Sequence, residues 1–365
     1  MGVCALLSVP LAPVAAEGEP MSGAEIYKSA CAACHGPDGR GRSSDELGFN
    51  LPMPDFTDCT FASREGNSDW IPVTVRGGPA RAFSDMMPAM GGALTEEEVK
   101  AALAHIRTFC GNPDWPRGEL NFPLPLYTGK AFPEDELVIH ATFEQEGLDS
   151  LTLTTTYEKR FGARNQMEVV VPFILQERQR RRDGKIDWDS GLGDVAVAVK
   201  RVMYHSYENG SILSAGTEVI LPTGDEDGGF GDGTVVIEPY IAYGQALPLR
   251  MFAQFQGGGA VPLEGDKGNE ELFARAVLGR TYFQDYYGRA YSPMLGLLAS
   301  RELADGTDTH WDLSPQLQVS LSKRQHVLLG LGCRVPLNKR DDRGVQYTAY
   351  LLWDWFDGGF FGGWR

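Results

Sequence analysis

The sequence predicts two folds in one chain: a small helical domain, then an antiparallel transmembrane β-barrel of about twelve strands. Three observations support this. Helix-start signals mark residues 17–112. A proline-rich stretch, expected to be an extended linker, covers residues 113–135. In residues 136–365, apolar and polar side chains alternate with the period of two that is typical of strands.

The first sixteen residues are expected to be an export signal. Residues 1–16 are uncharged and end in Val14-Ala15-Ala16, which is typical of an apolar segment before a cleavage site. The usual positive start is missing, so we expect a signal whose start is either truncated or wrongly assigned. We expect cleavage after Ala16. Cys4 lies in this segment and has no lipid-attachment motif before it.

Two capping boxes predict the main helices of the small domain. Ser22 is followed three residues later by Glu25, and the predicted helix runs on toward Cys31. Thr95 and Glu98 form the second box, which opens a helix ending at about Phe109.

The run Cys31-Ala32-Ala33-Cys34-His35 carries the most specific chemistry of the chain. Two thiols at this spacing can both add to the vinyl groups of a haem, and the histidine that follows can bind the iron. A redox dithiol would follow a strand, whereas this motif follows a helix start. A zinc site would need a second ligand pair nearby, and none appears. The motif therefore predicts covalent haem.

A second axial ligand is expected from a methionine loop. Met86, Met87 and Met90 precede the last helix, and a thioether ligand opposite histidine raises the reduction potential of haem iron. Cys59 and Cys110 flank this loop and the last helix, so they could form a disulfide in an oxidising compartment. Cys333, in a predicted strand, is expected to be a small apolar residue.

Residues 20–112 resemble the mono-haem class I cytochromes c. The resemblance is carried by five features of the sequence: Gly23 with Tyr27, Cys-x-x-Cys-His, Gly36–Gly41, Met87-Pro88-Ala89, and Leu94-Thr95-x-x-Glu98. It implies one haem c held by Cys31, Cys34 and His35, with Met87 as the distal ligand and Met86 or Met90 as fallbacks. His105 replaces the aromatic residue usual in the family and is expected to pack rather than to bind iron.

The alternation after residue 136 predicts the barrel. In 311–322 one face is wholly apolar and the other wholly polar. The predicted strands begin near Glu136, Leu151, Gln166, Leu192, Ser211, Thr234, Leu249, Glu270, Ala290, His310, His326 and Val345. Short connections alternate with longer, charged ones, as in outer-membrane barrels with short periplasmic turns. This rule places both barrel ends, and the helical domain, on the periplasmic side.

The polar face of the strands is expected to line the lumen. It carries carboxylates opposed by a few cations: Glu144, Glu158, Glu168, Asp194, Glu218, Glu238, Glu271, Asp312 and Asp354, with Lys200, Arg275 and Arg334. We expect an acidic lumen that favours cations. Aromatic residues at strand ends, such as Tyr286, Tyr287 and Trp353, are expected to form an interfacial girdle.

The β-rich part resembles the small outer-membrane barrels classed as transporters, including its turn at 221–225. The combination of domains resembles the cytochrome–porin fusions of Fe(II)-oxidising bacteria. This resemblance implies electron transfer, from an external donor such as Fe(II) to a periplasmic carrier. The alternatives are an outer-membrane solute transporter or channel with a docked cytochrome, or a soluble secreted haem protein.

Missing catalytic motifs and the net charge argue against two other classes of function. The β-rich part contains no nucleophile triad, metal-ligand cluster or phosphate loop, which favours an electron carrier over an enzyme. The net charge of −16 argues against nucleic acid as a partner.

Overall fold

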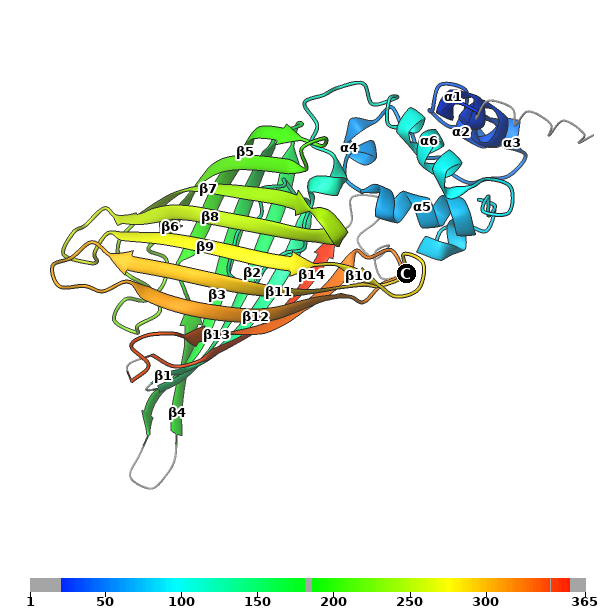
Figure 1. Cartoon of the computed structure of the whole chain (residues 1–365). Coiled ribbons are helices and arrows are strands. Elements are labelled where there is room, and N and C mark those ends of the chain that lie inside the picture. Colours follow the sequence, from blue (N-terminus) through cyan, green and yellow to red (C-terminus); the bar gives the residue numbers. More distant parts are fainter. Residues whose placement is uncertain (1–20, 147, 181–185, 342, 355–365) are drawn as a thin grey trace, which may run out of the picture.

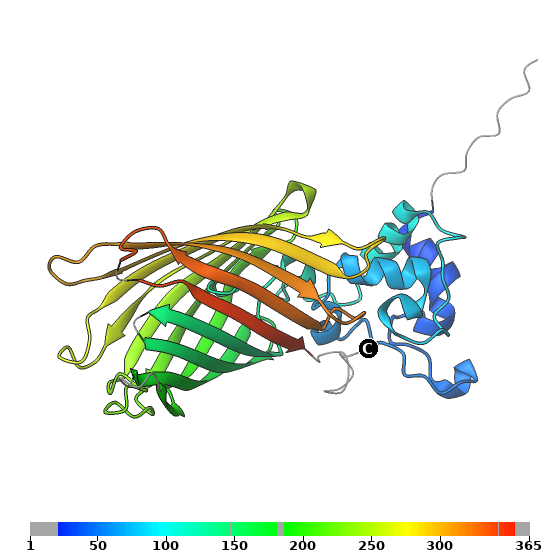
Figure 2. The ribbon, with the colours of Figure 1, turned by 90° about the horizontal axis from the view of Figure 1, so that it is seen from below.

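The structure, a computed structural model, describes residues 21–146, 148–180, 186–341 and 343–354. The expected signal segment 1–16 and Cys4 lie outside this part. A helical domain sits at one end of a β-barrel, and a view turned by 90° shows the same arrangement (Figures 1 and 2). No helix in the described ranges is long and apolar enough to span a bilayer.

The helical domain consists of short elements. They are α1 (Gly23–Ile26), the π-turn η1 (Tyr27–Cys31), α2 (Ala32–His35), α3 (Ser44–Leu47), α4 (Cys59–Ala62), α5 (Asn67–Arg76), the 3₁₀ turn η2 (Gly78–Arg81) and α6 (Glu96–Ile106). Both expected capping boxes are confirmed, at Ser22 and at Thr95. A third, unpredicted box at Ser43 opens α3.

The first and last helices cross closely at Gly23. A Cβ atom at Gly23 would lie 2.1 Å from the carbonyl oxygen of Ala101 on α6, so only glycine fits there. Tyr27 next to this crossing is buried and packs against His105, with ring centroids 5.4 Å apart. His105 is thus a packing residue, as expected. A disulfide joins Cys59 and Cys110, closing the domain over 51 residues.

The β-rich part is a closed antiparallel barrel of twelve strands, as predicted. The strands are β1 (Glu136–Glu146), β2 (Leu148–Phe161), β3 (Asn165–Arg180), β4 (Ile186–Leu192), β5 (Val195–Ser206), β6 (Ser211–Leu221), β7 (Val236–Leu247), β8 (Met251–Pro262), β9 (Glu271–Arg280), β10 (Tyr282–Phe283), β11 (Ala290–Glu302), β12 (His310–Ser320), β13 (Val327–Pro336) and β14 (Gln346–Asp354). β4 continues into β5 and β9 into β10, and β14 pairs with β1 to close the barrel. Every predicted start lies within three residues of an observed one, the largest shifts being at β2 and β5.

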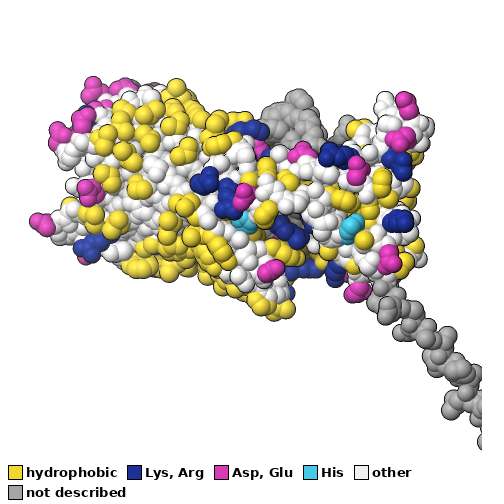
Figure 3. Space-filling model, turned by 90° about the horizontal axis from the view of Figure 1, so that it is seen from above, with side chains coloured by type: hydrophobic (Ala, Val, Ile, Leu, Met, Phe, Trp, Pro, Cys, Tyr) yellow, Lys and Arg dark blue, Asp and Glu magenta, His cyan; other side chains and the backbone are white. Residues whose placement is uncertain are grey.

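The barrel surface is apolar outside and polar inside. Val199, Leu295 and Leu331 are among the large apolar side chains that are about half exposed, and apolar atoms gather over the barrel in Figure 3. Ser214 and Ser314, by contrast, are fully buried within the lumen face. This is the reverse of a water-soluble sheet and suits a surrounding bilayer.

The lumen carries the expected carboxylates, but its cavity is not acidic. A cavity of about 400 Å³ is lined by ionic side chains of both signs: Glu158, Glu168, Glu218 and Glu271, with Lys130, Lys200, Arg275 and Arg334. At the other end, Asp312 binds both Arg334 and Arg343. Equal numbers of opposite charges line the cavity, so the expected preference for cations has no support there.

Part of the expected linker fills the barrel. Residues 120–135, here the plug segment, follow the turn η3 (Gly118–Leu120) and enter the lumen. Leu120, Phe122 and Phe132 are buried in one apolar cluster with inward-facing residues of the strands. Leu126 joins a second cluster with Val138, Tyr350 and Leu352.

Side chains of the lumen satisfy the backbone of the plug segment. Lys200 Nζ donates to the carbonyls of Lys130 and Phe132 at 2.9 and 3.0 Å. Six further bonds involve five strands. Gln254, Tyr350 and Ser214 donate to the carbonyls of Pro123, Leu124 and Ala131. The side-chain oxygens of Gln316, Gln256 and Gln166 accept from the N–H groups of Leu126, Gly129 and Glu134. An extended chain has no backbone partner of its own, so these bonds hold it in place.

Loss of the Lys200 ammonium should open the plug. Lys200→Met removes two charge-assisted bonds, which should destabilise the closed state by roughly 2–4 kcal/mol and so raise the open population by about thirtyfold or more. We expect conductance events in planar bilayers for this variant and almost none for the wild type. Arg201→Met is the control, because Arg201 neighbours Lys200 on β5 but is exposed and bonded to Asn165. A wild type that conducts like an open pore would contradict the closed plug.

Candidate haem site

The structure places the Cys-x-x-Cys-His motif on the first helical run. Cys31 ends the π-turn η1, and Cys34 and His35 lie in α2, which ends where Gly36 adopts a φ of 74°. Tyr27 donates its hydroxyl to the carbonyl of Gly36 at 2.6 Å, and Gly41 N–H donates to the carbonyl of His35 at 2.9 Å. These bonds fix the turn that presents the histidine.

The side chains of the motif are free to bind a haem. Both thiols are unpaired and half-buried. His35 Nδ1 is buried and has no hydrogen-bond partner among the described residues. Burial lowers the pKa of His35, which favours the neutral imidazole that binds iron. No group of three or more acidic, histidine or cysteine residues that could hold a metal ion occurs in the described ranges. The two unpaired thiols and the neutral imidazole of His35 fit covalent haem.

The methionine loop is held against the end of α5. Gly78 N–H donates to the carbonyl of Met87 at 3.0 Å, and Met90 N–H donates to the carbonyl of Thr74 at 2.9 Å. Met86 is 49% exposed, whereas Met87 is half-buried. Met87 is thus less exposed than Met86, as expected for a ligand of a buried haem iron. Its role as distal ligand stays a prediction.

An aromatic core joins His35 to the same helix. The His35 ring lies 5.1 Å from Phe56, and Phe56 lies 5.5 Å from Trp70 on α5, measured between ring centroids. Arg107 stacks over Trp70 at 3.6 Å. Helix α5 therefore lies between the two parts of the candidate site: Trp70 packs toward His35 through Phe56, and Thr74 accepts a bond from Met90 in the methionine loop. Phe56 and Trp70 are themselves buried.

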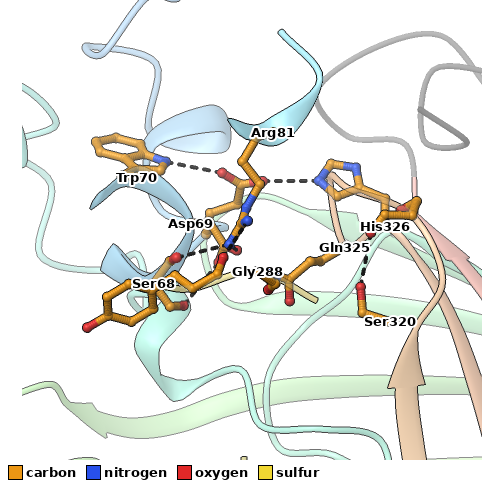
Figure 4. A network of polar contacts seen from close by, with 11 residues as sticks. Ser68, Asp69, Trp70, Arg81, Gly288, Ser320, Gln325 and His326 are labelled. Atoms are coloured by element: carbon orange, nitrogen blue, oxygen red, sulfur yellow. Dashed lines mark hydrogen bonds and ion pairs between the residues drawn. The ribbon is translucent and has the colours of Figure 1, made fainter. Parts of the chain in front are cut away.

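The side of the helical domain that faces the barrel carries a polar network that the sequence did not reveal. Arg81 is buried and donates to the carbonyl of Tyr287 in the β10–β11 turn at 2.6 Å. His326, before β13, lies 3.0 Å from Glu65 and 2.9 Å from Asp354. Figure 4 shows Arg81 and His326 converging between the two domains. Arg64 forms a further buried ion pair with Asp135.

Burial and neighbouring charges shift the pKa values of His326 and Asp69 in this network. Burial alone would lower the pKa of His326, but Asp354 and Glu65 raise it well above the usual 6.5. Burial and the charge of Glu65 raise the pKa of Asp69 to about 6. The imidazolium therefore sits between two carboxylates, a buried arrangement that is costly to break on one side only.

Two tyrosines expected in the lipid-interface girdle lie elsewhere. Tyr286 and Tyr287 pack against the core of the helical domain. Tyr286 donates its hydroxyl to Glu96 at 3.1 Å. Tyr282 and Tyr291 stay exposed on the barrel and stack on each other at 5.4 Å. A tyrosine ring with a polar tip suits a protein contact as well as a membrane interface, which is why sequence alone could not separate the two.

Replacing His326 should loosen the contact between the domains in a pH-dependent way. The folded state raises the pKa of His326, so protonation of this histidine stabilises the folded contact. This stabilisation is complete below pH 6.5 and is lost as the pH rises through the raised pKa. His326→Gln removes the positive charge between the Glu65 and Asp354 carboxylates, which should cost roughly 3–5 kcal/mol below pH 6.5 and less at alkaline pH. Hydrogen exchange of the turn 321–326 measures this. His310→Gln, at the other end of the barrel, is the control, and an equal loss at every pH would contradict the ion-pair account.

Comparison with known protein families finds a match for the helical domain. Residues 18–106 match the family model described as "Cytochrome C oxidase, cbb3-type, subunit III". No curated protein sequence matches the chain.

The barrel is similar to solved outer-membrane structures. The NanC porin matches with a TM-score of 0.41 and 9% identity over 60% of this chain and 99% of the porin. The KdgM porin matches with a TM-score of 0.36 and 9% identity over the same shares. The β domain of the Bordetella autotransporter BrkA matches with a TM-score of 0.37 and 13% identity, over 60% of this chain and 98% of that one. The chain therefore carries an N-terminal match to a cytochrome c family model, followed by a barrel that the pairing of β14 with β1 closes.

Proposed function

We propose that this chain is an electron-transfer protein of the outer membrane. Its cytochrome domain would hold one haem c through Cys31 and Cys34, with His35 and Met87 as axial ligands. The observation that carries the proposal is the Cys-x-x-Cys-His motif, with both thiols free, in a domain docked on a barrel mouth. A haem bound there supplies reversible one-electron chemistry.

The protein residues have separate tasks in this proposal. The two cysteines fix the cofactor, and the neutral His35 imidazole provides the proximal ligand. A Met87 thioether on the other side favours the reduced iron and so raises the reduction potential. Phe56 and Trp70 shield the site from water, which limits charge solvation and tunes the potential in the same direction.

Three features support an outer-membrane location with the cytochrome in the periplasm. The barrel has an apolar outer surface and a polar lumen, as transmembrane barrels do. Its short turns, such as 162–164 and 207–210, lie at the cytochrome end, where outer-membrane barrels have their periplasmic turns. The Cys59–Cys110 disulfide agrees with an oxidising compartment, and residues 1–16 with export.

The alternative functions fit the structure less well. A solute channel would need an open lumen, yet the plug segment crosses it with apolar side chains and bonded backbone and leaves a cavity of about 400 Å³ beside it. A soluble secreted protein would not expose so many large apolar side chains around its barrel. The barrel thus serves mainly to anchor the cytochrome at the membrane.

The plug segment also bears on the electron donor. A donor that reaches the cytochrome through the barrel, such as Fe(II), has to pass this segment. We therefore propose that a soluble periplasmic carrier is the first partner of the haem, and that exchange with an external metal cation is slower.

Loss of the two motif cysteines should remove the haem and leave the barrel. The Cys31→Ser/Cys34→Ser double variant should lose the haem-stained band, because no thioether bond can form. The wild type should give a haem band in the outer-membrane fraction that migrates differently before and after boiling. Cys333→Ser, which removes the free thiol of β13, should keep the band. A wild-type haem band found only in the soluble fraction would refute the membrane location.

Sidedness can be tested in sealed vesicles that hold the protein in one orientation. A membrane-impermeant reductant on the cytochrome side should reduce the haem quickly, and the same reductant on the opposite side should do so at least about tenfold more slowly, because the plug blocks the lumen. Lys200→Met should narrow this difference. Fast reduction of the wild type from the opposite side would instead support a donor that enters through the barrel.

A further inference from the structure

Within its own domain, the methionine loop of the cytochrome is held mainly by backbone bonds, while most of its side chains are exposed. Between residues 83 and 89, five of the seven residues are exposed, including Phe83, Asp85 and Met86. Within the cytochrome, backbone bonds hold the two ends of the loop: Phe83 to Gly78 and Gly78 to Met87 at its start, and Met90 to Thr74 and Gly91 to Val75 at its end. The side chains between these ends are mostly exposed, so contacts from outside the domain can contribute to the position of the loop.

One barrel turn reaches the loop through Arg81. This residue is only 3% exposed, and its guanidinium donates to the carbonyls of Tyr287 at 2.6 Å and Ser68 at 3.1 Å. It also lies 3.3 Å from the Asp69 carboxylate. Figure 4 shows Arg81 between the start of α5 and the β10–β11 turn. Arg81 ends η2, the turn whose first residue, Gly78, bonds to Met87.

A second barrel turn contacts the loop itself. Arg324, in the β12–β13 turn, donates to the carbonyl of Ala82 at 3.4 Å, and its guanidinium lies 4.3 Å from the centre of the Phe83 ring. Ala82 has a φ of 54°, a left-handed conformation that is unfavourable for alanine and persists only when its surroundings hold it. Arg324 binds the loop at this strained residue.

The two turns also support each other and the neighbouring helix. Gln325 donates to the carbonyl of Gly288 at 3.1 Å, which ties the β12–β13 turn to the β10–β11 turn. Tyr286 donates to Glu96 at the start of α6 and lies under Arg76 at the end of α5. Both helices that flank the methionine loop are thus fixed to the barrel.

We infer that these two barrel turns position the methionine loop, so that ligation of the haem iron by Met87 depends on docking to the barrel. This inference rests on the proposed haem site. Arg324 and the Tyr287 carbonyl are positioning groups, because they act on the ligand loop and not on the haem. The barrel would then set the reduction potential of the cytochrome as well as anchor it.

Carbon monoxide binding to the reduced full-length protein tests this inference. Carbon monoxide occupies a haem only where the distal ligand has left, so the wild type should bind little. Arg324→Ala removes both loop contacts and should raise carbon monoxide binding at least about tenfold, with a lowered midpoint potential. Arg324→Lys, which keeps the charge but not the planar contact with Phe83, should fall between the two.

Controls distinguish failure of this inference from loss of the haem or misfolding of the barrel. Lys323→Ala, an exposed neighbour in the same turn, should behave as the wild type. Haem content and heat-shifted migration report cofactor attachment and barrel folding for every variant. Arg324→Ala with wild-type carbon monoxide binding and potential, at equal haem content and with a folded barrel, would overturn the inference. Absence of haem from the wild type would refute the proposed function instead.

Discussion

Closure of the barrel by backbone hydrogen bonds is the constraint on which the rest of the architecture depends. β14 pairs with β1 over nine residue pairs, from Glu136↔Asp354 to Glu144↔Gln346, so the sheet closes on itself. With an even number of antiparallel strands, the first strand begins and the last strand ends at the same mouth. The cytochrome, the plug segment and the end of β14 therefore meet there, and His326 can lie between Glu65 and Asp354.

Closure also creates an interior that has to be filled. The plug segment supplies apolar side chains to one half of the lumen, and the strands supply amide, hydroxyl and ammonium groups for its backbone. Proline suits this segment because an extended chain without a neighbouring strand cannot use all of its N–H donors. The segment that connects the two domains thus also closes the barrel between them.

The sequence predicts the features that depend on local pattern. Period-two alternation located the strands because lipid and lumen lie on opposite faces of each strand. The capping boxes located α1 and α6, and the haem motif depends on five consecutive residues. The plug was not predictable, because its backbone partners, such as Lys200 and Gln316, come from separate strands. The Arg81–Tyr287 and Glu65–His326 contacts join residues 206 and 261 positions apart, and no local signal marks them.

The location of the basic residues explains why the two domains form one unit. Arg64, Arg76 and Arg81 of the cytochrome all contact the plug segment or the barrel turns, through Asp135, Tyr286 and Tyr287. A guanidinium can donate in several directions at once, so the buried Arg64 and Arg81 can bond to a carboxylate or to carbonyls, while the exposed Arg76 stacks on a ring. A lysine at position 81 could not serve Tyr287, Ser68 and Asp69 with the same planar geometry. The docking is therefore specific in orientation, which an electron-transfer site needs if the same loop is always to face the same partner.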